Sequence, residues 1–229
     1  DFSCEDGRAA IDALDRSRAN PAVHREKVMK AAPALSGMRT DTSPLETVFM
    51  GRYVREGCSI EKYVIGADRP IPIPALIFVP NGGSGLAAKL PAVLWFGGSG
   101  KAADAAPGGR LETLARGGYL VLAADLPGIG ELGGDSGGDS VIRGVNYNLV
   151  FGAQLVGGSV TGIQADAVLR CLRALLARAD ADPARISAVA TGTVGPALLH
   201  AALAETRMAS IALVNAPLSW ESILDLEYY

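Results

Sequence analysis

Residues 188–202, AVATGTVGPALLHAA, read as a short buried strand, a tight glycine turn and the start of a helix. A strand that turns sharply into a helix is the setting of the G-x-S-x-G motif, in which a nucleophilic serine sits on a strained turn. In this sequence Gly192 occupies the serine position, between Thr191 and Thr193. The stretch therefore predicts the turn without its usual nucleophile.

Working outward from this turn, apolar strands alternate with helices along the chain. The predicted strands lie at 53–65, 74–80, 91–96, 119–125, 186–190 and 211–214. The predicted helices between the later strands lie at 108–118, 161–179 and 195–205, with Thr161 as an N-cap. Nearly continuous apolar strands that alternate with helices predict an α/β fold, with a mainly parallel sheet covered on both faces. The first two strands look antiparallel, which makes the sheet mixed.

The N-terminal part differs from this pattern. Residues 5–33 have a loose apolar face typical of helix, interrupted at Asn20 and Pro21, and Pro33 is expected to end the helical stretch. Residues 35–50 read as a mostly polar linker. The sequence thus predicts a helical segment and linker at 1–50, followed by an α/β domain at 51–229.

Composition excludes several classes of function. The 229 residues are 49% hydrophobic and 20% charged with a net charge of −3, so a globular protein without a basic nucleic-acid-binding surface is expected. The apolar runs are strand-length, which predicts no membrane span. Two histidines and three cysteines without CxxC spacing predict no metal site, and no cofactor is expected. Asp135 and Asp139 lack the spacing of an EF-hand calcium loop.

The cysteines leave two alternatives open. A Cys4–Cys58 disulfide is conceivable, and free thiols are equally compatible with the sequence. Cys171 falls on the apolar face of the predicted helix at 161–179 and is expected in the core.

Three glycine-rich loops follow predicted strands: FGGSGK at 96–101, DLPGIG at 125–130 and ATGTVG at 190–195. In such sheets ligand sites lie beyond the carboxyl ends of the strands, so these loops are the predicted site. Ser99 borders the cleft as a weak candidate nucleophile. The GGSGK segment fails the Walker pattern, because Ala102 stands where Ser or Thr is required. Asp125 is expected to brace its loop, and the long loop at 127–160 is expected to be functional or mobile.

The order of these pieces resembles the α/β-hydrolase superfamily, and more closely the acetyl-xylan-esterase-like branch of bacterial carbohydrate esterases. The segments that carry the resemblance are EKYVI with IPIPALIFVPNG, PAVLWFGGSGKAAD, GGYLVLAADLPGIGE, QADAVLRCLRALLARADADPARI and the turn with ALLHAAL, between about residues 50 and 224. The resemblance implies hydrolysis of a carbohydrate ester or another small acyl ester through an acyl-enzyme. It also implies an oxyanion hole near the backbone N–H groups of Gly97, Gly98 and Thr193.

Departures from the family pattern fall at the catalytic positions. The family serine falls on Gly192, the histidine of its oxyanion strand end falls on Phe96, and the acid of some members falls on Asn215. His200 lies about two helical turns past Gly192, where a packed helix histidine is expected, and His24 is expected to be solvated. No residue carries over as nucleophile, acid or base, so the catalytic residue stays unknown, with Thr193, Thr191 and Ser99 as weak candidates.

Two hypotheses of function follow. The chain is either a carbohydrate-esterase-like hydrolase that works without a standard triad, or a catalytically inactive homologue kept for binding or assembly. The family sheet continues past its sixth strand, so the fold is expected to be truncated after 211–214, and the open apolar edge there implies a missing C-terminal segment or a homo-oligomer. The resemblance and the absent initiator methionine favour a secreted or periplasmic protein, with a cytoplasmic one as the alternative.

Overall fold

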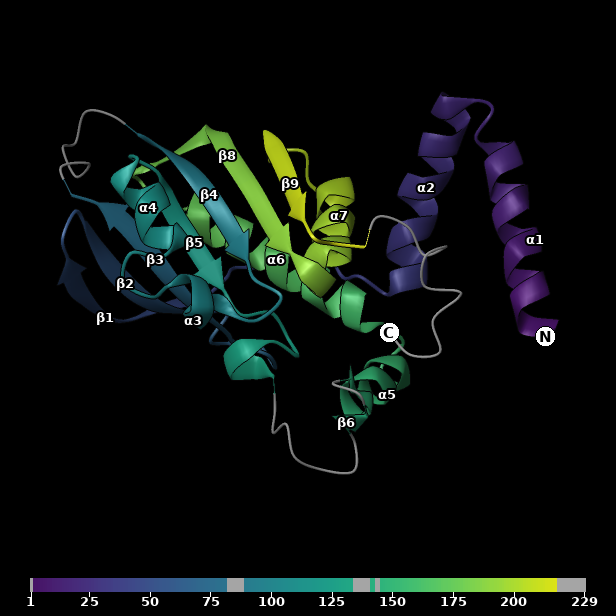
Figure 1. The fold of residues 1–229 in the computed structure, drawn as a ribbon, viewed down its shortest axis with the longest axis horizontal. Helices are drawn as coiled ribbons and strands as arrows, with labels where there is room; N and C mark the ends of the chain where they lie inside the picture. Colours follow the sequence, from purple (N-terminus) through teal and green to yellow (C-terminus); the bar gives the residue numbers. More distant parts are fainter. Residues whose placement is uncertain (1, 82–88, 134–140, 143–144, 218–229) are drawn as a thin grey trace.

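The computed structural model describes residues 2–81, 89–133, 141–142 and 145–217. Within these ranges the chain forms a seven-stranded mixed sheet with helices on both faces (Figure 1). The strands of this sheet are β1 (Thr47–Arg55), β2 (Cys58–Ile65), β3 (Ile73–Pro80), β4 (Leu90–Phe96), β5 (Leu120–Ala124), β8 (Ala181–Thr191) and β9 (Ser210–Val214). The α-helices are α1 (Phe2–Ser17), α2 (Pro21–Ser36), α3 (Lys101–Asp104), α4 (Arg110–Arg116), α5 (Tyr147–Leu155), α6 (Val160–Leu176) and α7 (Gly195–Ala204).

The strand order is β1-β2-β3-β5-β4-β8-β9. The first three strands are antiparallel to one another, and β3 is antiparallel to β5. From β5 to β9 all neighbours are parallel, with β4 in the middle between β5 and β8. The expected α/β architecture and mixed sheet are therefore confirmed.

Each face of the sheet has its own apolar core, which explains the nearly continuous apolar strands. One core packs β-strand side chains such as Leu94 and Leu122 against α6 and α7, through Leu172 and Leu198. The core on the opposite face packs Phe78, Trp95 and Val121 against α4, through Leu111 and Ala115. Strands buried on both faces lose the alternation of polar and apolar residues.

The first predicted strand, 53–65, is wrong as a single element. The chain reverses after Arg55 at a turn where Gly57 has φ +83°, and β1 and β2 pair as an antiparallel hairpin. β1 also begins at Thr47, inside the predicted polar linker. An edge strand exposes most of its residues and therefore lacks a strong apolar signal.

The predicted N-terminal helical stretch consists of two helices. Asn20 caps α2, with its Oδ1 accepting hydrogen bonds from the N–H groups of Ala22 and Val23 at 3.2 and 3.4 Å. The expectation that Pro33 ends the helix is wrong, because α2 continues to Ser36. Proline removes one donor, but the Pro33 carbonyl still accepts the N–H of Gly37, whose φ of +64° terminates the helix.

The predicted loop at 127–160 contains regular structure. It holds the short 3₁₀ helix Gly130–Leu132, the two-residue strands β6 (Val141–Ile142) and β7 (Val145–Asn146), and α5. The N-cap of α6 is Ser159 rather than Thr161, since Ser159 Oγ accepts the Gly162 N–H at 3.0 Å. Asp135 and Asp139 lie outside the described residues.

β9 lies at the end of the sheet, where it pairs with β8 alone among the described strands. Ile211 and Val214 are each 39% exposed on this strand. In the ranges that the structure covers, no helix is long and apolar enough to span a membrane.

Candidate functional site

Three loops meet at the carboxyl ends of the parallel strands, as the sequence predicts. The loop after β4 contacts the loop after β8 through the Gly98 N–H, which donates to Thr191 Oγ1 at 3.1 Å. It contacts the loop after β5 through the Lys101 N–H, which donates to Asp125 Oδ1 at 2.6 Å. The parallel pairing of β5, β4 and β8 brings these distant segments to one edge of the sheet.

The turn after β8 has the backbone form of the nucleophile motif. Thr191 ends the strand, Gly192 has φ +64°, a short 3₁₀ turn follows and α7 begins at Gly195. A Cβ at Gly192 would meet only the Gly98 Cα within 4 Å, at 3.9 Å. The turn has a positive φ and room for a side chain, and no side chain of the described residues fills that room.

The three weak candidate nucleophiles lie near this room without a catalytic partner. Thr191 Oγ1 accepts the Gly98 N–H, and Thr193 and Ser99 are exposed. Across the described residues, no hydrogen bond joins the hydroxyls of Thr193 or Ser99 to an acid or a histidine. A hydroxyl needs an adjacent base to become a nucleophile, so the arrangement does not activate any of the three.

Gly98, one of the predicted oxyanion residues, lies against the turn, whereas a Cβ at Gly97 would face Asp104 and Gly100. A Cβ at Gly98 would stand 2.7 Å from the Thr191 carbonyl oxygen and 3.4 Å from the Thr193 nitrogen, so only glycine fits this close approach. However, the Gly98 N–H already donates to the Thr191 hydroxyl. An oxyanion would have to compete with that bond for the Gly98 donor. Phe96, at the position of the family histidine, is 1% exposed and belongs to the core.

Asp125 braces two of the three loops, as expected. Its carboxylate is 1% exposed and accepts the Lys101 N–H at 2.6 Å, the Lys101 ammonium at 2.7 Å and the Glu131 N–H at 2.9 Å. Lys101 Nζ also contacts Glu131. Gly130, with φ +56°, leaves no space for a Cβ, which would lie 2.4 Å from the Asp125 carboxyl carbon. All oxygens of Asp125 are thus committed to structure.

Sequence reasoning missed Lys101, whose side chain is 5% exposed. Lysine is seldom buried unless it is paired. In the sequence this lysine stands out only as the last residue of the GGSGK segment, which does not match the Walker pattern. Its position directly after a glycine loop, with an acid ending the neighbouring strand, is the signal that could have identified the pair.

His24, His200 and Asn215 make no hydrogen bond to the turn at Gly192 among the described residues. His200 Nδ1 lies 2.8 Å from the Pro196 carbonyl oxygen, one turn earlier in α7, which agrees with a packed helix histidine. His24 lies in α2, where it is partly buried rather than fully solvated. Asn215 is exposed just after β9 and has φ +51°.

Neither a metal cluster nor a disulfide occurs at the described cysteines. Cys58 and Cys171 are fully buried free thiols, so the conceivable Cys4–Cys58 disulfide does not form. Burial raises the pKa of both thiols, to about 12 for Cys171. No group of three or more His, Cys, Asp or Glu side chains that could hold a metal is found in the part of the chain that the structure describes.

Comparison with solved structures identifies the fold. A glucuronoyl esterase from Solibacter usitatus matches with a TM-score of 0.59 and 14% identity, over 82% of this chain and 56% of its own. An acetyl xylan esterase from Thermoanaerobacterium sp. JW/SL YS485 matches with a TM-score of 0.58 and 19% identity, over 89% and 62%. An acetyl xylan esterase from Paenibacillus sp. R4 matches with a TM-score of 0.55 and 22% identity, over 80% and 56%.

The chain therefore has the α/β-hydrolase fold, shared with carbohydrate esterases, as the sequence predicts. It spans between 56% and 62% of the length of these three structures. No protein-family model matches the sequence, and no curated protein matches it.

Proposed function

We propose that this chain is an esterase-type α/β-hydrolase domain that binds its ligand, or a partner, without hydrolysing esters through its own turn residues. One observation supports the proposal: Gly192, on which the resemblance places the nucleophile, has φ +64° in a strand-to-helix turn, and among the described residues only the Gly98 Cα would lie within 4 Å of a Cβ there. Acyl transfer through a covalent intermediate needs an atom at that point to attack the carbonyl.

The expected loss of hydrolysis rate without a nucleophile favours the non-hydrolytic hypothesis. Removal of a catalytic serine lowers kcat by about a million-fold in a hydrolase that keeps its oxyanion donors. Backbone N–H groups near Gly97, Gly98 and Thr193 supply at most the residual rate, and one of them is occupied by Thr191 Oγ1. The non-hydrolytic role is therefore the better supported one.

The competing function is an ester hydrolase with a nonstandard nucleophile. It is favoured by the exposure of Ser99 and Thr193 beside the empty position. In this alternative the substrate is a carbohydrate ester or another small acyl ester, the chemistry that the names of the matching structures carry.

Hydrolysis of p-nitrophenyl acetate tests the proposal. The purified chain is compared with Ser99→Ala, Thr193→Ala and Gly192→Ser, after intact mass and circular dichroism have been recorded. We expect no turnover above buffer in the unmodified chain and no change in the two alanine variants. Turnover in the unmodified chain that disappears in Ser99→Ala or Thr193→Ala would refute the proposal and identify the nucleophile.

We further infer that the open edge of β9 is covered in the functional protein, by a further strand of a longer chain or by a second copy. The support is that, among the described strands, β9 pairs with β8 alone, and that Ile211 and Val214 are exposed on it. Light scattering across a concentration series measures the assembly state. A monomer at all concentrations would contradict coverage by a second copy.

Two other inferences rest on the resemblance. We infer that helices α1 and α2 form an appendage to the α/β domain, since α2 packs on α7 and α6 and α1 stands outside it (Figure 1). The α/β domain then begins with β1 at Thr47, a few residues before the expected boundary at 51. We also infer that the protein works outside the cytoplasm, as a secreted or periplasmic protein. Cell fractionation with a C-terminal tag tests the second inference, and retention in the cytoplasm would contradict it.

A further inference from the structure

A cavity lies where the C-terminal end of α2, the loop between β2 and β3 and the N-terminal part of α6 meet. Its volume is 410 Å³, within the range of small-molecule pockets. None of its lining residues belongs to the three loops of the candidate site. The lining consists of an apolar wall of Pro70, Ile71, Val156 and Ile163, the glycines Gly37, Gly158 and Gly162, and the charged residues Arg39, Asp41, Arg69, Asp166 and Arg170. We call it the arginine cavity.

Arg170 is the buried charge of the arginine cavity, with a side chain that is 6% exposed. Its Nη1 donates to the Ile71 carbonyl oxygen at 2.7 Å. Its Nε lies 3.0 Å from Asp166 Oδ2, but among the described residues neither Nε nor Nη2 makes a hydrogen bond. Buried polar groups are nearly always hydrogen-bonded. Arg170 therefore keeps N–H groups without an acceptor beside the cavity.

Asp166 is a weak counter-charge for Arg170. Its side chain is 23% exposed, and within the described ranges its carboxylate accepts no hydrogen bond and has Arg170 as its one ion-pair partner. Burial raises the pKa of Asp166, although the Arg170 guanidinium acts in the opposite direction. The charged form of this carboxylate is therefore less stable here than in water.

Arg39 has no counter-charge in the part of the chain that the structure describes. Its Nη2 donates to the carbonyl oxygen of Val156 at 3.4 Å, and no carboxylate lies at ion-pair distance from it. Arg69, by contrast, is paired with Asp41 at 2.7 Å and with Asp68 at 3.3 Å. The charges gathered around the cavity are those of Arg39, Arg69, Arg170 and Arg173 against those of Asp41, Asp68 and Asp166. One positive charge is left over.

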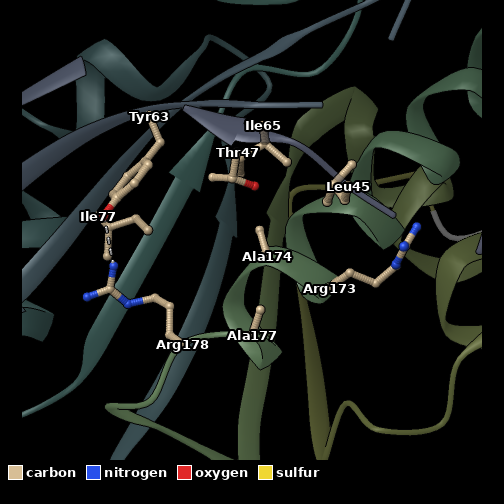
Figure 2. Close-up of a pocket in the computed structure, with 9 residues that line it drawn as sticks. All are labelled: Leu45, Thr47, Tyr63, Ile65, Ile77, Arg173, Ala174, Ala177 and Arg178. Carbon is tan, nitrogen blue, oxygen red and sulfur yellow. Dashed lines mark hydrogen bonds between the residues drawn. The ribbon is translucent and has the colours of Figure 1, made fainter. Parts of the chain in front are cut away.

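A hollow of 480 Å³ between α6 and the strands β1, β2 and β3 shows that arginines alone do not leave such a charge (Figure 2). There Arg178 donates to Asp180 at 2.9 and 2.7 Å and to Glu61 at 2.8 Å, so two carboxylates compensate it. Arg173 points away from this hollow and donates to the carbonyl oxygens of residues 41–43 (Figure 2). Arg173 thereby holds the segment that carries Asp41 to the arginine cavity.

We propose that the arginine cavity binds a small organic carboxylate. The carboxylate accepts N–H groups of Arg39 and Arg170, and its apolar body lies against the wall of Ile71, Val156 and Ile163. Hydrogen bonds between a guanidinium and a carboxylate are about twice as strong as neutral ones, and the planar guanidinium matches both oxygens. The single positive charge left over suits a monoanion, and the apolar wall favours an organic anion over inorganic phosphate.

Titration with benzoate, followed by ¹H–¹⁵N correlation spectra at neutral pH, tests the proposal. Benzamide is the neutral probe of the same shape, and inorganic phosphate is an anion without an apolar body. We expect benzoate to bind in about the millimolar range, as suits so small a ligand. The amide shifts should centre on Ile71, Ile163 and Arg170. Benzamide and phosphate should each bind about tenfold more weakly, since each lacks one of the two contacts.

Two variants change the charge of the cavity in opposite directions. Arg39→Gln should weaken benzoate binding by about tenfold, and Arg39→Lys should retain part of the affinity. Asp166→Asn keeps the shape of the side chain but removes a carboxylate that repels the ligand, so it should strengthen binding by about fivefold. Arg185→Gln, which removes an arginine paired with Asp182 elsewhere, is the control and should change nothing.

Four results would overturn the proposal. They are equal binding of benzoate and benzamide, equal binding of benzoate and phosphate, unchanged benzoate binding in Arg39→Gln, and amide shifts that centre away from the cavity. Arg39 is exposed and makes one hydrogen bond within the described ranges, so its variants should fold as the unmodified chain does. The dispersion of the same spectra shows whether they do.

Discussion

The Asp125 brace allows the sharpest prediction about stability. Asp125→Ala removes a carboxylate that is 1% exposed and that accepts three hydrogen bonds from Lys101 and Glu131. The change leaves the Lys101 ammonium, 5% exposed, with Glu131 as its remaining partner, and the Glu131 side chain is 68% exposed. Removing one partner of a buried ion pair costs about 3–5 kcal/mol, a large part of the stability of a typical domain. The exposed Glu131 carboxylate offsets little of that loss.

Urea denaturation followed by circular dichroism measures this effect. We expect Asp125→Ala to lower the free energy of unfolding by about 4 kcal/mol, the middle of the range for a broken buried ion pair. Asp15→Ala is the control, since Asp15 and Arg18 form a pair that is more than half exposed, and the expected loss is about 0.5 kcal/mol. A loss below about 1 kcal/mol in Asp125→Ala would refute the reasoning.

A double variant separates the charge from the shape of the site. Lys101→Met with Asp125→Leu replaces the buried pair by apolar side chains of similar size. Such replacements are often neutral or stabilising, so we expect the double variant to be more stable than Asp125→Ala alone. If the double variant is as unstable as Asp125→Ala, the loss of stability comes instead from the main-chain N–H groups of Lys101 and Glu131, which lose their acceptor.

Three other predictions follow from the structure. Gly192→Ala should lower the free energy of unfolding by about 1 kcal/mol, because Gly192 has a positive φ. Gly98→Ala should lower it further, because the added Cβ would collide with the Thr191 carbonyl oxygen. Chemical denaturation compares the two variants. Burial raises the pKa of Glu61, but the hydrogen bonds and charges of its two arginines outweigh burial and hold that pKa below its usual 4.5. The ionised Glu61 therefore stabilises the folded protein fully above about pH 4.5, and this contribution is lost as the pH falls through the lower pKa of the folded state. Glu61→Gln should make the free energy of unfolding, measured by denaturation at a series of acid pH values, depend less on pH. An unchanged pH dependence would contradict this. Cys58 and Cys171 should resist iodoacetamide in the folded protein and react after unfolding, because both thiols are buried and burial raises their pKa. Peptide mass spectrometry detects the labelled cysteines. Labelling of either cysteine in the native protein would contradict the prediction.

The local pattern of the sequence was sufficient where burial is strong on both sides of an element. The strands near 91–96 and 119–125 and the long helix α6 were predicted within a few residues. The strand near 211–214 was also predicted, from its apolar residues, although β9 is mostly exposed. The empty turn at Gly192 could also be read directly, because glycine at a strained position is a local property of the chain.

Where burial is weak, the same signals failed. β1 is an exposed edge strand and was merged with β2 or assigned to a linker. Pro33 was expected to end a helix that in fact runs to Ser36, because a proline near the last turn sacrifices only one hydrogen bond.

The sequence by itself determined the class of fold, the glycine at the strand-to-helix turn and the bracing role of Asp125. Only the tertiary structure decided that Lys101 is the partner of Asp125, and that the Gly98 N–H donates to the Thr191 hydroxyl. The physical reason is that these properties depend on which distant segments share a sheet edge or a helix face. Strand order and side-chain pairing of that kind are set by the packing of the whole chain, and no local spacing encodes them.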